Sequence, residues 1–79
     1  MVFLSISWAD LIRILSKVGY IKYKQKGSHA QLKYKGNIPI TIPCHKELKE
    51  GLFNHLLNDI AEDLWMTKQE VFVMIKKEI

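Results

Sequence analysis

The 79-residue sequence predicts an α+β fold, in which helices cover one face of a three-stranded antiparallel sheet. Two patterns indicate this class. Near both ends of the chain, apolar residues recur every three or four positions, which is typical of amphipathic helices. Between these segments apolar and polar residues alternate, as in strands that bury one face. We therefore expect the order α-β-β-β-α plus a short terminal helix, in one domain spanning residues 1–79.

The first helix is predicted at about residues 8–18. Ser7 and Asp10 match a capping box, because the serine oxygen can accept a hydrogen bond from a free amide of the first turn, where an acidic residue is also favoured. The apolar stripe that follows consists of Trp8, Leu11, Ile12, Leu15 and Val18. Gly19 supplies the left-handed conformation that ends many helices.

After the first helix the period of the pattern changes to two. Lys22, Lys24 and Lys26 alternate with apolar, aromatic and amide side chains, so we expect these three lysines to line one face of a strand. The segment Lys26-Gly27-Ser28 then predicts the connection of a β-hairpin.

In the second predicted strand, His29 shares a face with Gln31 and Lys33, and apolar residues occupy the alternate positions. We expect the helices to cover the apolar face and the lysines to lie with His29 on the other. After a turn at Gly36-Asn37, the third strand is predicted from its alternate isoleucines, Ile38, Ile40 and Ile42. Because Pro39 has no amide hydrogen, this strand is expected at a sheet edge.

Two further helices are predicted after Pro43. The first begins near Glu50, and its apolar face is formed by Phe53, Leu56, Leu57 and Ile60. Thr67 and Glu70 match a capping box for a short last helix, which we expect to pack against the preceding one after a turn near residues 64–66.

Basic residues are concentrated in one part of the chain. The net charge is +4, and no acidic residue lies between Asp10 and Glu47, the interval that holds most of the lysines. A cluster of basic residues creates a positive electrostatic field that attracts polyanions, of which nucleic acid is the commonest. A solvated lysine face with no partner is the alternative interpretation.

Cysteine and hydropathy patterns predict a cytoplasmic protein. Cys44 is the single cysteine and has no partner for an internal disulfide, which fits a reducing compartment. No apolar run approaches the roughly 20 residues that span a bilayer, so no membrane association is expected.

Two motifs carry a resemblance to a known family. Gln25-Lys26-Gly27-Ser28-His29 is followed by the segment Ile42-Pro43-Cys44-His45-Lys46-Glu47-Leu48-Lys49-Glu50-Gly51. In order and spacing, this pair resembles the signature of HicA-type toxins of toxin–antitoxin systems, and the resemblance extends from about Ser7 to Val71. Leu52 stands where many relatives have threonine, and Trp65-Met66 replaces a turn that usually contains glycine.

The resemblance implies a double-stranded-RNA-binding-like fold and an endoribonuclease that cleaves messenger RNA. It also implies a HicB-type antitoxin as protein partner. The sequence does not indicate an oligomeric state.

A metal-free ribonuclease requires proton transfer and positive charge near the scissile phosphate. His29 is the predicted general acid or base, because histidine holds both protonation states near neutral pH. The predicted RNA-binding residues are Lys22, Lys24, Lys26, Gly27, Ser28, Lys33, His45 and Lys46. The position of His45 fits a second acid–base group, a phosphate contact or a helix-entry residue, and its role stays open.

Other polar and aromatic residues are given structural roles. We predict no metal site and no cofactor, because Cys44 and His45 have no second ligand pair nearby. His55 is predicted on the second helix, away from the basic face. Four aromatic residues offer rings that could stack bases, but most of them are expected to pack in the core: Trp8, Tyr20, Tyr23 and Tyr34.

Two other classes of function remain open. A non-catalytic module that binds double-stranded RNA would use the same lysine face to contact phosphates. A protein-interaction domain would use it to bind an acidic partner.

Overall fold

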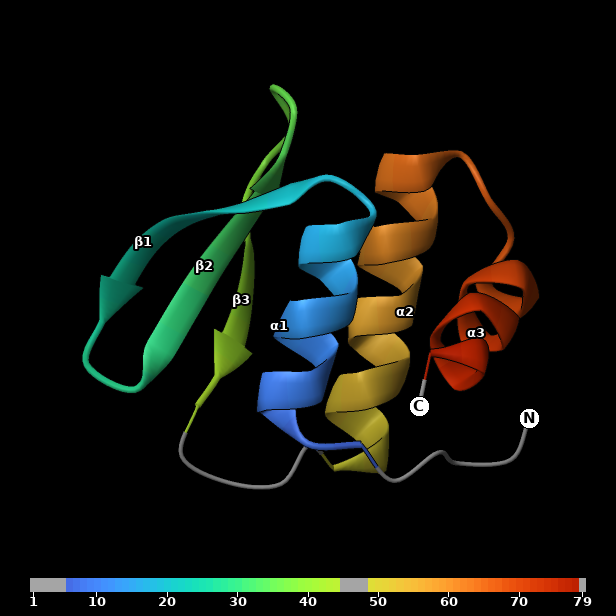
Figure 1. Cartoon of the computed structure of the whole chain (residues 1–79), viewed down its shortest axis with the longest axis horizontal. Helices are drawn as coiled ribbons and strands as arrows, with labels where there is room; N and C mark the ends of the chain where they lie inside the picture. The colour runs from blue at the N-terminus through green and yellow to red at the C-terminus, as the bar shows by residue number, and fades with distance from the viewer. Residues whose placement is uncertain (1–5, 45–48, 79) are drawn as a thin grey trace.

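A computed structural model describes residues 6–44 and 49–78 of the chain. The elements follow the order α1 (Trp8–Lys17), β1 (Tyr20–Lys26), β2 (His29–Tyr34), β3 (Ile40–Pro43), α2 (Glu50–Leu64) and α3 (Lys68–Lys77). The three strands form one antiparallel sheet in the order β1-β2-β3, and the helices lie on one side of it (Figure 1). The predicted α+β class and element order are confirmed.

α1 begins where the sequence predicts and ends at Lys17, one residue before the predicted end. The Ser7 Oγ accepts a hydrogen bond of 3.1 Å from the backbone N–H of Asp10, which satisfies one free amide of the first turn. Beyond the helix, Gly19 has a φ of +116°, and a Cβ there would lie 3.0 Å from Cε1 of Tyr34. Glycine is therefore required at this position by both its backbone conformation and its close neighbour.

β3 is shorter than predicted. The isoleucine pattern predicts a strand from Ile38, but the strand begins at Ile40 and Ile38 is 85% exposed. The preceding turn causes this difference, because Lys35 has a φ of +53° and the backbone N–H of Asn37 donates to the Tyr34 carbonyl. Pro39 consequently precedes the ladder. β3 pairs with β2 alone, so the prediction of an edge strand is confirmed.

The core lies between the sheet and the helices. α1 contributes Leu11, Ile14 and Leu15, and α2 contributes its predicted apolar face, all of them buried. The sheet contributes its own inward residues, which are Tyr20, Ala30, Leu32, Ile40 and Ile42. This packing leaves the opposite face of the sheet free of core residues.

Asp63 joins the sheet to α2. The Tyr20 hydroxyl donates a 2.6 Å hydrogen bond to Asp63 Oδ2, and Asn37 Nδ2 donates a 3.1 Å bond to Asp63 Oδ1. Burial raises the pKa of the Tyr20 hydroxyl above its usual value, and the hydrogen bond to Asp63 raises it further. One carboxylate thereby fixes β1 and the β2–β3 loop against the C-terminal end of α2.

α2 and α3 are connected by a tight turn at Trp65. This residue follows the last helical residue in a left-handed conformation, with φ 58° and ψ 41°, and the backbone N–H of Met66 donates to the Ala61 carbonyl. α3 then begins with the predicted capping box, in which both Thr67–Glu70 bonds are present. The bonds to Thr67 lower the pKa of Glu70. The predicted packing of α3 against α2 is also confirmed.

The described helices include none with the length and apolar content needed to cross a bilayer.

Replacing Trp65 by glycine is expected to stabilise the fold. A left-handed conformation costs an L-residue about 1 kcal/mol relative to glycine, and the Trp65 side chain is 95% exposed, so its removal takes away little packing. For a chain of this size the gain corresponds to a rise in Tm of about 4–8 °C. Trp65→Ala is the matched control, because it removes the side chain and keeps the strain, and we expect its Tm to equal that of the parent. Thermal unfolding followed by circular dichroism measures both, and a Trp65→Gly variant that melts below the parent would contradict the prediction.

Candidate functional site

His29 is the first residue of the central strand. It lies directly opposite Lys26 of β1 and Pro43 of β3, and it is exposed. The next residue, Ala30, faces the core, so alternation along the strand directs His29 to the face away from the helices. The structure therefore places His29 on the predicted face, at the hairpin end of the sheet.

A two-residue turn at Gly27-Ser28 connects β1 to β2. Gly27 has a φ of +58°, which is the left-handed conformation that two-residue hairpin turns require. A Cβ at Gly27 would meet no atom within 4 Å, so the surface beside the turn is open. Gln25 Nε2 donates to the Gly27 carbonyl at 3.1 Å, which adds a side-chain contact to the turn.

The two sequence motifs lie side by side at this end of the sheet. The backbone N–H of Cys44 donates to the Ser28 carbonyl, directly beyond the pairing of His29 with Pro43. The Cys44 thiol is half-buried and donates to the Ile42 carbonyl at 3.4 Å. The chain that leaves β3 is thereby bonded to the hairpin that carries His29.

A β-bulge in β1 divides the predicted lysine row. Lys24 and Lys26 lie opposite Gln31 and His29, whereas Lys22 lies opposite Leu32, and the register shifts between Lys22 and Lys24. Side chains of directly opposite residues share a face. Lys24 and Lys26 therefore share the face of His29, and the prediction that Lys22 shares it is wrong, because the extra residue at position 23 reverses the alternation.

The bulge also directs an aromatic ring outward. Tyr23 has no directly opposite residue and is 58% exposed, so the expected core packing does not extend to it. Lys33, which pairs with Ile21, places its Nζ 4.9 Å from the centre of the Tyr23 ring. We define the outer face of the sheet by Tyr23, Lys24, Lys26, His29, Gln31 and Lys33, and the residues directly opposite them on this side are Ile21, Thr41 and Pro43. Among the six defining residues, Tyr23 and Gln31 are the two that the sequence did not predict as site residues.

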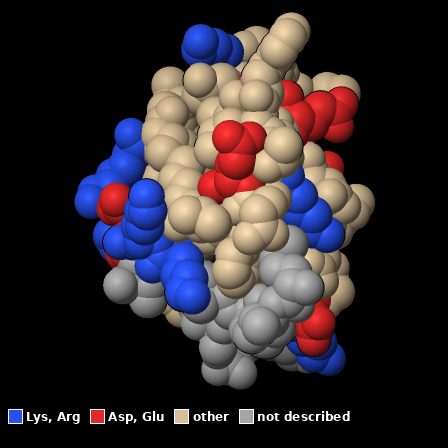
Figure 2. All heavy atoms as spheres, turned by 90° about the vertical axis from the view of Figure 1, so that its right-hand side faces the viewer, with Lys and Arg blue, Asp and Glu red and all other residues tan. Residues whose placement is uncertain are grey.

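Charge is distributed unequally between the sheet and the helices. β1, β2 and β3 contain no acidic residue. On the side of the molecule where α3 lies, acidic groups stand near the centre and at the right, and basic groups gather at the left with a further patch right of centre, so that face carries both signs of charge (Figure 2). The sheet is therefore the part of the described chain that fits a polyanion.

Several predicted residues lie elsewhere. His45 and Lys46 fall outside the described residues. His55 is exposed on α2, where its Nε2 lies 3.6 Å from Asp59 Oδ2, in keeping with its predicted place on the second helix. Among residues 6–44 and 49–78, no group of three His, Cys, Asp or Glu side chains converges in a way that could hold a metal ion.

The chain was compared with models of known protein families and with curated proteins. Residues 8–61 match the family model described as the HicA toxin of bacterial toxin–antitoxin systems. The matched segment covers more than half of the chain, from α1 through the sheet and most of α2, and it includes His29 and the hairpin turn. No curated protein matches the chain.

Proposed function

This chain belongs to the HicA toxin family of bacterial toxin–antitoxin systems, and we propose that it is a metal-independent endoribonuclease that cleaves messenger RNA. His29 is its proposed general acid or base. The observation that carries this proposal is the placement of His29, exposed at the hairpin end of a sheet face that also presents Lys24 and Lys26. Action in the cytoplasm, where messenger RNA is found, fits the single cysteine.

RNA carries its own nucleophile, so the protein does not need to supply one. The 2′-oxygen of the ribose attacks the adjacent phosphorus as its proton leaves, and the bond from phosphorus to the 5′-oxygen breaks as that oxygen gains a proton. The products are a 2′,3′-cyclic phosphate and a 5′-hydroxyl. His29 would perform one of the two proton transfers, a role that contributes about 10²- to 10⁴-fold to the rate. This chemistry needs no metal ligand set, because the 2′-oxygen of the RNA is itself the nucleophile.

The lysines would bind the backbone of the RNA. Lys26 lies directly opposite His29, and Lys24 lies next along the same face, opposite Gln31. Their charges would hold the phosphate and offset the charge that develops on it during the reaction. Gly27 leaves room for the backbone to approach the turn, and Ser28, His45 and Lys46 remain proposed contacts from the same two motifs.

Tyr23 favours a single-stranded substrate. An exposed aromatic ring on a basic surface can stack an unpaired base, whereas bases within a duplex are already stacked on each other. Lys33 lies over the ring at 4.9 Å and would leave the opposite side of the ring for a base. We infer that Tyr23 stacks a base whose phosphates contact the neighbouring lysines.

As a member of a toxin–antitoxin family, the chain implies an antitoxin partner. We propose that this partner is a HicB-type protein that covers the outer face of the sheet. Covering His29 and the lysines would block both substrate entry and proton transfer, and an acidic partner surface would be attracted to the same face.

His29→Ala is expected to lower the cleavage rate of single-stranded RNA by about 10²-fold or more, because it removes the proposed proton-transfer group. The fold should be unaffected, since His29 is exposed and adds nothing to the core. His55→Ala is the matched control and should cleave like the parent. The assay is run in EDTA, where we expect the parent to remain active.

Three outcomes of this assay would count against the proposal. Parental cleavage by a folded His29→Ala variant would refute the role of His29. Activity that disappears in EDTA and returns with one divalent ion would refute metal independence. RNA binding by the parent without any cleavage would favour the non-catalytic binding module.

Lys24→Ala and Lys26→Ala are expected to weaken RNA binding more than Lys22→Ala does, because the bulge places Lys22 on the other face. The effect should be similar for RNAs of different sequence, since phosphate contacts carry little base information. The slope of log affinity against log salt should fall by about 0.7 for each phosphate that is no longer neutralised. Fluorescence anisotropy at several salt concentrations measures both quantities. Equal weakening in all three variants would show that the bulge does not separate the lysines in function.

Tyr23→Ala is expected to weaken binding of single-stranded RNA by roughly five- to a hundredfold, the range expected when one base can no longer stack. Tyr23→Phe keeps the ring and serves as the control, with affinity close to that of the parent. Binding of an RNA duplex should change little in either variant, because a duplex offers no unpaired base. An identical decrease for Tyr23→Phe would assign the effect to the hydroxyl and would contradict stacking.

A further inference from the structure

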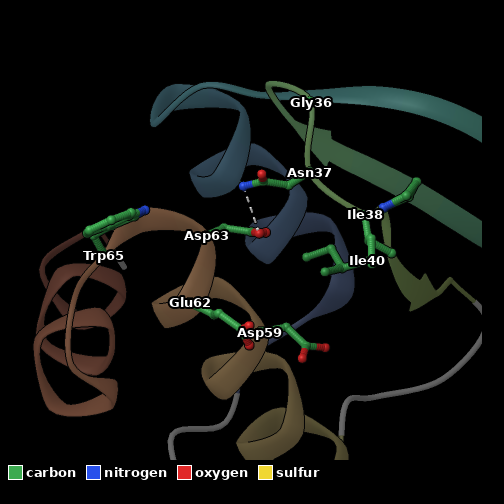
Figure 3. A pocket seen from close by; sticks show the side chains of 9 residues that line it. Gly36, Asn37, Ile38, Ile40, Asp59, Glu62, Asp63 and Trp65 are labelled. Carbon is green, nitrogen blue, oxygen red and sulfur yellow. Dashed lines mark hydrogen bonds between the residues drawn. The ribbon is translucent and has the colours of Figure 1, made fainter.

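A groove lies at the opposite end of the sheet from His29. It has a volume of about 690 Å³ and is lined by residues 36–40, from the β2–β3 loop and the start of β3, and by Asp59, Glu62, Asp63 and Trp65. The two walls come from distant parts of the sequence and are held together by the bond between Asn37 and Asp63 (Figure 3). β2 spans six residues, so at about 3.3 Å per residue its two ends lie about 17 Å apart.

Two large apolar side chains stand exposed at the ends of this groove. Ile38 is 85% exposed and Trp65 is 95% exposed. Trp65 lies at one end and Ile38 at the other, and the acidic side chains of α2 lie between them (Figure 3). Tryptophan is among the residues that contribute most to protein interfaces, where it is buried by the partner. Its exposure here provides an anchor for a second protein.

The presence of tryptophan at position 65 is not explained by a contribution to the stability of the isolated chain. The residue occupies a left-handed conformation that glycine adopts without strain, and its exposed side chain gains little packing in return. Positions that break a local rule without a compensating contact are expected at functional sites.

The charge of the groove indicates the chemistry of its occupant. Its lining contains three acidic residues and neither lysine nor arginine, in a chain whose net charge is +4. Asp63 accepts bonds from two neutral groups, and Asp59 faces His55. Within the described chain, Glu62 takes part in no ion pair. Such a groove repels RNA phosphates and fits a protein segment that carries Lys or Arg among apolar side chains.

We propose that this groove is a second docking site for the antitoxin, separate from the outer face of the sheet. The antitoxin segment inserts a cationic side chain between Ile38 and Trp65 and covers both apolar residues. The proposal rests on the proposed function only in taking the antitoxin as the partner. The groove and His29 lie at opposite ends of β2, so a segment bound in the groove does not itself cover His29. Contacts in the groove slow dissociation of the complex, whereas contacts at the outer face block cleavage.

The test measures dissociation of the purified complex between this chain and its cognate antitoxin, in the absence of RNA. Trp65→Gly and Trp65→Ala should each raise the dissociation rate by about tenfold or more, as expected when an interface anchor is removed. Glu62→Lys should also raise it, because it places a like charge against the cationic segment. Val73→Ser is the matched control and should dissociate like the parent. Val73 is an apolar residue of α3 that is 39% exposed and lies outside the groove.

Two further readouts separate this docking site from the nuclease site. The free Trp65 variants should cleave RNA at the parental rate, and saturating antitoxin should still inhibit them fully, because the outer face of the sheet is unchanged. Dissociation rates equal to that of the parent for the Trp65 variants and for Glu62→Lys would overturn the proposal. So would a lower Tm for Trp65→Gly, or a parental homodimer that the Trp65 variants no longer form, which would make a second copy the occupant. Failure of the nuclease proposal would appear in the His29→Ala assay and would leave these dissociation rates unaffected.

Discussion

β2 is paired along both of its edges, and the register of these two ladders determines which groups stand beside His29. Lys26 lies opposite it on one side and Pro43 on the other. A slip by one residue would turn His29 toward the helices and move Ala30 and Leu32, which are 1% and 0% exposed, into water. Burial of the apolar face therefore fixes the outer face, although the side chains of that face add nothing to the core.

The sheet is held at both ends by polar contacts of different kinds. At the hairpin end, a backbone bond from Cys44 to Ser28 brings the two sequence motifs together. At the other end, the carboxylate of Asp63 accepts hydrogen bonds from the hydroxyl of Tyr20 and the side-chain amide of Asn37, and the second of these bonds fixes the β2–β3 loop against α2. The first contact builds the surface proposed to cleave RNA, and the second builds the groove. The six residues of β2 separate the two surfaces.

The sequence was sufficient to predict the helices and the face of His29, because the signals for both are local. Ser7 and Thr67 accept the expected capping bonds, and the alternation of β2 survives in the structure without interruption. The bulge was not predicted, since Lys22, Tyr23 and Lys24 continue a regular pattern. The bulge arises because the seven residues of β1 pair with the six residues of β2, which leaves one residue of β1 without a partner. This difference in length can be recognised only when the paired residues at both ends of the two strands are known.

The start of β3 and the role of Trp65 depend on backbone conformation, which the residue pattern does not encode. Ile38 continues the alternation of the isoleucines, yet the left-handed Lys35 and the bonded Asn37 keep it outside the ladder. The sequence did show that Trp65 departs from the usual glycine-containing turn of the family it resembles. The structure adds that Trp65 has a φ of 58° and an exposed ring, so neither its backbone conformation nor its packing accounts for a tryptophan at this position.

Opposite charges on the two proposed surfaces bear on how an antitoxin would recognise this chain. A partner that matched the lysines of the outer face alone would need only acidic groups, and many acidic proteins would compete for that face. A partner that also fills the acidic groove must present a cationic and apolar segment about one strand length away from its acidic surface. Few proteins carry both features at that spacing, so the second contact adds discrimination that a purely acidic partner cannot provide. RNA, being anionic throughout, matches the outer face and is repelled by the groove, which would leave the groove available to the antitoxin whether or not RNA is bound.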